Sequence, residues 1–156
     1  MTGNQKELLA RLLQEQISGL QQLVSTLQQE QHMLVTHDGT GLEAISAGKS
    51  AQINALQSLS EAFRQQLCNL CGSQDIDAQK AWLASNLSDD PDWQTWNQLA
   101  RQSQQLNEQN GKLIEQSLQF QARQLAVLVP QEENKLYNAT GFADFKPTLT
   151  RKRDIV

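Results

Sequence analysis

Two cysteines and two histidines are the residues of this chain whose types and spacing could do chemistry. Cys68 and Cys71 form a Cys-x-x-Cys pair, a spacing found in thiol redox sites and in one half of many zinc sites. No second pair exists, because the chain has only two cysteines. The pair lies at the end of a helical pattern, where cysteine also serves as a small apolar residue. Packing is the favoured interpretation, and redox or metal binding are the alternatives.

The histidines, His32 and His37, are five positions apart at the end of a predicted helix. They are not spaced to complete a zinc site on one helix, and no glycine-rich nucleophile turn lies near them. The sequence also has neither the Glu-x-x-His pair of di-iron bundles nor a glycine-rich phosphate loop. We therefore expect no enzyme, no metal and no cofactor. A helical bundle that carries a phosphoryl group on His32 or His37 is a distant alternative.

Charge and hydropathy exclude two further classes of protein. A net charge of −4 and a pI near 5.1 leave no broad basic surface for nucleic acid. The one basic cluster, Arg151 to Arg153, is followed by Asp154 and is expected to be solvated. The first residues lack the apolar core of a signal peptide, and no apolar run is long enough to cross a bilayer. We expect a cytoplasmic protein without membrane insertion.

The elements that must position these residues are helices, because the chain is rich in Gln and Leu and has only three prolines and eight glycines. The longest helical pattern runs from Pro91 to Val129. Asp90 supplies an acidic N-cap before Pro91, and Pro130 ends the pattern. A seven-residue repeat forms one edge of its apolar face, at Leu99, Leu106, Leu113, Phe120 and Val127.

This apolar face is wide enough to need two neighbouring helices, since Trp93, Trp96 and several leucines broaden it. Polar residues nevertheless run along its middle, namely Ser103, Asn107, Asn110, Ser117 and Gln121. Such residues can fix the register of a bundle, as a buried asparagine does in coiled coils. Alternatively, they weaken the packing of this apolar face within the bundle, so that a helix from another protein can bind there.

Two further long helices are predicted, from about Gln5 to Thr36 and from Thr40 to about Leu70. The short break at His37–Gly41 makes them an antiparallel hairpin. We expect an N-terminal capping pair from Asn4 and Glu7, and a capping box from Thr40 and Glu43. Lys49 is expected to extend outwards along its aliphatic stem.

A short helix is predicted between the hairpin and the last long helix, from Ile76 to Leu87, with Asp75 or Asp77 as its cap. It would cover one end of the bundle, and a lengthened connecting loop is the alternative. The predicted fold is thus all-α: an antiparallel up-and-down bundle of three long helices and one short helix, over residues 1–130. Residues 131–156 lose the helical period and form a flexible C-terminal tail. Its apolar residues suggest a segment that orders on a partner, and an inert tail is the alternative.

Two sequence motifs lie in the last third of the chain. An Asn-x-x-Asn-Gly-x-Leu segment comprises Asn107, Asn110, Gly111 and Leu113 in the last long helix. A Leu-Tyr-x-x-x-Gly segment follows at Leu136, Tyr137 and Gly141. Together they resemble the FlgN family of bacterial flagellar export chaperones. The first two helices are also similar, at Gln29–Gln31 and Leu42–Ile45, so the resemblance extends over nearly the whole chain.

The resemblance implies a cytosolic chaperone of the flagellar type III secretion system. Such a chaperone binds the C-terminal amphipathic helices of the hook–filament junction proteins FlgK and FlgL, prevents their premature association and delivers them to the export gate. We expect the client to contact Asn110, Gly111, Leu113, Ile114, Leu118, Leu125 and Leu128. We expect the export gate component to contact Leu136, Tyr137 and Gly141. A coiled-coil scaffold or adaptor without a client is the competing class.

Overall fold

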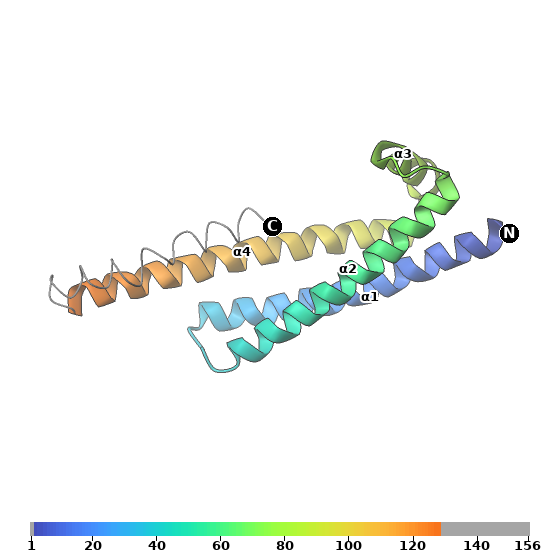
Figure 1. Cartoon of the computed structure of the whole chain (residues 1–156). Coiled ribbons are helices and arrows are strands. Elements are labelled where there is room, and N and C mark those ends of the chain that lie inside the picture. Colours follow the sequence, from blue (N-terminus) through green and yellow to red (C-terminus); the bar gives the residue numbers. More distant parts are fainter. Residues whose placement is uncertain (1, 129–156) are drawn as a thin grey trace. The chain divides into compact units, whose positions relative to one another are not determined.

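A computed structural model describes residues 2–128 of the chain. In this span it contains four helices and no strand: α1 (Thr2–Val35), α2 (Leu42–Cys71), α3 (Ile76–Leu87) and α4 (Pro91–Leu128) (Figure 1). The predicted all-α class, with three long helices and one short one, is confirmed. None of the helices in residues 2–128 is long and apolar enough to cross a membrane. The predicted tail, residues 131–156, lies outside the described residues.

The chain divides inside α4 into two compact units, with the boundary between Leu113 and Ile114. The first unit contains α1, α2, α3 and the beginning of α4. The described part of the second unit is the helical segment Ile114–Leu128. The predicted domain boundary at residue 130 lies beyond the described residues and stays a prediction.

The start of α4 follows the predicted chemistry. Asp90 Oδ1 accepts hydrogen bonds from the backbone N–H groups of Asp92, at 2.8 Å, and Trp93, at 3.3 Å. These N–H groups have no carbonyl partner within the helix, so the carboxylate supplies their hydrogen-bond acceptor. Its negative charge also interacts favourably with the positive end of the helix dipole. Pro91 occupies the first helical position, where its missing N–H costs nothing. Asp90 is therefore the N-cap of α4.

Two other capping predictions are wrong. Helix α1 already begins at Thr2, so Asn4 lies inside its first turn and does not cap it with Glu7. The N-cap of α2 is Gly41, which has a φ of 93° and makes no side-chain capping bond. Thr40 lies one residue too early for a capping box with Glu43. Its hydroxyl donates instead to Asp38 Oδ1, at 2.6 Å, and its N–H donates to the same atom at 3.0 Å.

The hydrogen bonds from Thr40 also hold the pKa of the Asp38 carboxyl below its ordinary value, because they favour the ionised form. The turn between α1 and α2 contains a residue other than glycine with positive φ, His37 at 55°. At the far end of α2, Gly72 has a φ of 72°, and its N–H closes the helix onto the Cys68 carbonyl at 2.8 Å. Both ends of α2 thus depend on left-handed glycines. Asp75 occupies the predicted N-cap position of α3 without making a side-chain capping bond.

In the first unit, α1 and α2 form the predicted antiparallel hairpin (Figure 1). Gly19 lets the two helices approach closely, because a Cβ at this position would lie 2.8 Å from Leu56 Cδ2. A core cluster of Leu9, Leu13, Phe63 and Leu67 lies between them. Helix α3 packs against this cluster through Trp82, Leu83 and Leu87, as predicted for a short helix over one end.

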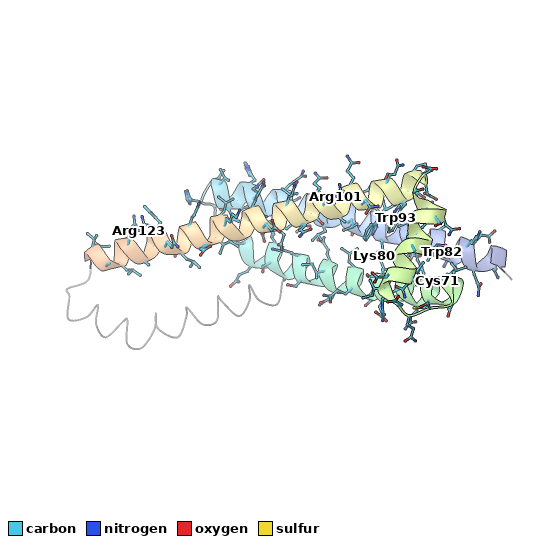
Figure 2. All side chains as sticks on the ribbon, turned by 90° about the horizontal axis from the view of Figure 1, so that it is seen from above. Cys71, Lys80, Trp82, Trp93, Arg101 and Arg123 are labelled. Carbon is cyan, nitrogen blue, oxygen red and sulfur yellow. The ribbon has the colours of Figure 1, made fainter. Side chains whose placement is uncertain are left out.

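Aromatic rings extend this core onto α4. The rings of Phe63 and Trp93 are stacked with centroids 6.3 Å apart, and those of Trp93 and Trp96 are stacked at 5.1 Å. Figure 2 shows Trp82 and Trp93 at the same end of the first unit as Cys71. The start of α4 is therefore held by aromatic packing at the α3 end of the hairpin.

Candidate functional site

The two cysteines make polar contacts around the turn between α2 and α3. Cys68 and Cys71 are free, half-buried thiols. Gln79 Nε2 donates to Cys68 Sγ at 2.9 Å, and Cys71 Sγ donates to the Ser73 carbonyl at 3.3 Å. The first contact joins α2 to α3 and the second joins the end of α2 to the turn that follows it, which agrees with the packing interpretation. Among residues 2–128 no group of three or more His, Cys, Asp and Glu side chains is placed to hold a metal ion.

Asn110 is fully buried between α4 and α1. Its Nδ2 donates to the Leu27 carbonyl and to Glu30 Oε1, each at 2.9 Å. Both amide hydrogens are thus directed at α1 inside the first unit, which favours a register role for Asn110 over direct contact with a client.

The prediction for Lys49 is wrong. Its side chain does not extend into solvent: only 20% of it is exposed, and Nζ lies 3.2 Å from Glu30 Oε1. The Glu30 carboxylate is almost completely buried, so it requires a cation and hydrogen-bond donors nearby. Lys49 on α2 and Asn110 on α4 supply them. One carboxylate therefore links three helices of the first unit.

The other polar residues of the α4 face have different environments. Ser103 is buried, and its hydroxyl donates to the Ala100 carbonyl of its own helix at 2.9 Å. Asn107 and Ser117 are half-buried, and Gln121 is exposed. Ser103 and Asn107 also line a pocket of about 140 Å³ within the first unit, together with Leu23, Leu27, Lys49, Ile53 and Gln104. This volume is well below the roughly 300–1,000 Å³ of ordinary ligand pockets.

The predicted client-binding leucines and isoleucine become more exposed along α4. Leu113 and Leu118 are half-buried. Exposure rises to 38% for Ile114, 41% for Leu125 and 79% for Leu128. Large apolar side chains exposed in series along one helix indicate a surface that binds another apolar surface. We call the segment Ile114–Leu128 the apolar segment of α4.

Sequence reasoning placed Phe120 and Val127 on the edge of this face but did not include them among the client-binding residues. The structure leaves 58% of Phe120 and 85% of Val127 exposed. The seven-residue repeat was the signal that could have identified them, because it continues unchanged past Leu113. The apolar segment contains two charged residues, Glu115 and Arg123, so apolar contact is the chemistry that it offers.

Gly111 is exposed on α4, and a Cβ at this position would meet no atom within 4 Å. The described residues therefore give no packing reason for a glycine there. The predicted gate-binding residues, Leu136, Tyr137 and Gly141, lie outside the described residues.

Comparison with known proteins adds two findings. A family model described as FlgN protein matches residues 1–144. The curated Flagella synthesis protein FlgN of Escherichia coli (strain K12) is 29% identical over 135 residues, which cover 85% of this chain and 88% of that protein. No solved structure matches the chain.

Proposed function

The chain belongs to the FlgN protein family, and from this premise we propose that it is a cytoplasmic chaperone of flagellar protein export. Its clients would be the C-terminal amphipathic helices of the junction proteins FlgK and FlgL. Before assembly such helices expose apolar faces that would associate prematurely. A chaperone that covers these faces keeps the clients competent for export.

The observation that carries this proposal is the apolar segment of α4. Its exposed side chains follow a helical repeat, which is the pattern by which one amphipathic helix binds another. With few charges in the segment, specificity would depend on the spacing of apolar side chains and on glutamine amides. The function requires no catalytic group, because binding and release of a helix involve no bond chemistry.

The direct test is isothermal titration of the protein with C-terminal peptides of FlgK and FlgL, with an unrelated amphipathic helix as the control. Saturable binding of the specific peptides, with Kd of about 1 μM or lower, would support the chaperone proposal. If the folded protein ignores both peptides and forms a stable homo-oligomer, the scaffold alternative is favoured.

The double variant Leu125→Asp with Leu128→Asp is expected to weaken client binding at least about tenfold. Truncating apolar anchors commonly costs more than about 1 kcal/mol each, and a carboxylate also opposes burial. Both side chains are exposed, so the fold is expected to survive. Titration with the same peptides measures the effect.

The matched control is Gln116→Asp with Gln119→Asp, which adds the same two charges to exposed positions of the same segment. This control should bind clients like the unmodified protein. Equal affinity of both double variants would show that the client binds elsewhere on the chain.

Replacing Gly111 with alanine should raise the free energy of unfolding by about 0.5–1 kcal/mol, because glycine is unfavourable inside a helix and the added methyl group meets no atom. Gly48→Ala is the matched control on α2, since that glycine also faces open space. Urea unfolding should give similar gains for both. If a client backbone approaches Gly111, as we propose, only Gly111→Ala will reduce client affinity. Unchanged affinity would exclude a contact at this glycine.

We further propose that Tyr137, with Leu136 and Gly141, binds the export gate component. Tyrosine is a frequent anchor of short binding segments, because its ring adds a large apolar area at a small entropic cost. Tyr137→Ala is therefore expected to bind client normally but to lose gate binding by about tenfold or more. Titration with a soluble domain of the gate component checks this, with Asn138→Ala as the neighbouring control. Loss of both interactions would indicate a role in folding instead.

A further inference from the structure

Two polar contacts in the first unit join α1 to α4 at equivalent positions. Trp96 Nε1 donates to Gln16 Oε1 at 3.1 Å, and Asn110 Nδ2 donates to Glu30 Oε1 at 2.9 Å. In both pairs the residues are 80 positions apart in the sequence. The two contacts are separated by two seven-residue repeats on each helix, from Gln16 to Glu30 and from Trp96 to Asn110. Helices α1 and α4 are therefore parallel and in one register. We call these contacts the Gln16 rung and the Glu30 rung.

The repeating leucines alone do not define this register. Leucines recur every seven residues on α1 at positions 13, 20 and 27, and on α4 at positions 99, 106 and 113. A shift of α4 by one repeat, about 10 Å at 1.5 Å per residue, would again place leucine opposite leucine. The leucine pattern thus permits several registers, and some other feature must select among them.

Each rung buries polar atoms at a cost. The side chains of Gln16, Glu30 and Asn110 are all buried. Two of their atoms, Gln16 Nε2 and Asn110 Oδ1, have no hydrogen-bond partner within the described residues. The Glu30 carboxylate additionally needs Lys49 to balance its charge. Apolar replacements of such groups are often neutral or stabilising, whereas a buried polar residue that fixes register is well attested.

We infer that the two rungs select the register of α4 on α1. Both contacts form together only when each α1 residue lies beside the α4 residue that is 80 positions later in the sequence. A shift by one repeat would separate Glu30 from Asn110 and leave both buried without this hydrogen bond. In this register Met33 of α1 corresponds to Leu113, the last α4 residue of the first unit. The rungs therefore decide which seven-residue repeats of α4 pair with α1 within the first unit. This inference concerns the bundle and does not depend on the identity of any client.

Cysteine cross-linking tests the register. Gln31 Nε2 donates to Gln109 Oε1 at 3.1 Å on the surface of the first unit, so cysteines at 31 and 109 are separated by about the span of two glutamine side chains, which a short thiol-specific cross-linker can bridge. Cysteines at 31 and 102, or at 31 and 116, become close only after a shift by one repeat in either direction. All three pairs replace glutamines, and all are made in a background with Cys68→Ser and Cys71→Ser. A short thiol-specific cross-linker joins the cysteines that lie within its reach, and the free and cross-linked forms are separated by electrophoresis.

With the rungs intact, only the pair at 31 and 109 should cross-link. A protein without the rungs carries Gln16→Leu, Glu30→Leu, Lys49→Met and Asn110→Leu. In this protein we expect one of the shifted pairs to reach roughly one tenth of the native-pair yield or more, a ratio that corresponds to about 1.4 kcal/mol between registers. Its urea midpoint should equal or exceed that of the unmodified protein.

Ser103→Ala is the control. It removes a buried hydroxyl from the same face of α4, and this hydroxyl donates only to a carbonyl of its own helix. It should cross-link at the native pair alone. Exclusive native cross-linking in the protein without rungs would overturn the inference. An unfolded protein would overturn it too, since the rungs would then contribute stability and not selection.

Discussion

Replacing Leu27 with alanine is expected to lower the free energy of unfolding by about 3 kcal/mol. Leu27 lies on α1 and has 1% of its surface exposed, which makes it one of the two largest fully buried side chains in residues 2–128. Removing it loses the transfer free energy of the deleted groups and leaves a cavity, and such leucine truncations cost about 2–5 kcal/mol. Its carbonyl accepts a hydrogen bond from Asn110, so a shift of the backbone would also disturb the contact between α1 and α4.

Urea unfolding followed by circular dichroism measures this loss. Leu8→Ala is the matched control on the same helix, because 44% of Leu8 is exposed, and it should cost less than about 1 kcal/mol. Similar losses for the two variants would mean that Leu27 is not part of the core in solution.

Lys49→Met is expected to destabilise the protein by about 3 kcal/mol. The substitution keeps the length of the side chain but leaves the Glu30 carboxylate buried without a cation. Removing one partner of a buried ion pair costs about 3–5 kcal/mol, because the remaining charge is uncompensated. Partial exposure of Lys49 places the expected loss at the lower end of that range.

The double variant Glu30→Gln with Lys49→Met should recover to within about 1 kcal/mol of the unmodified protein, since a buried pair can be replaced by neutral groups at little cost. Its glutamine retains an oxygen that can accept the hydrogen bond from Asn110. Arg64→Met is the control for an exposed ion pair, Arg64 with Glu61, and should have a much smaller effect. If Lys49→Met and the double variant are equally unstable, poor packing of methionine at position 49, and not the unpaired charge of Glu30, is responsible.

Helix periods and end signals in the sequence predicted the fold to within a few residues. Asp90 and Pro91 predicted the start of α4 closely, because proline and an acidic cap act locally. The start of α2 was predicted less well, because a left-handed Gly41 precedes it. Glycine permits that conformation but does not require it, so the sequence could not exclude a cap at Thr40.

The candidate site was predictable in its apolar part and not in its polar part. Periodicity along one helix is visible in the sequence and predicted the apolar face of α4, but Phe120 and Val127 on its seven-residue repeat were not included among the client-binding residues. The partner of Asn110 was not predictable, because Glu30 is 80 residues away on another helix. The orientation of Lys49 depends on the same buried carboxylate. Pairing between helices needs the packed structure.

Parallel pairing of α1 with α4 also has a consequence for synthesis of the chain. Helix α2 follows α1 directly and can form the hairpin early, because its contacts are local. The hairpin is complete at Cys71, the end of α2, and Asn110 follows 39 residues later. At about 5–20 residues per second, the ribosome needs about 2–8 s to add these residues. During that interval the hairpin exists without α4, and the α1 surface that α4 covers is open to other proteins. The nascent chain is thus itself expected to be a substrate for another chaperone until α4 has been made.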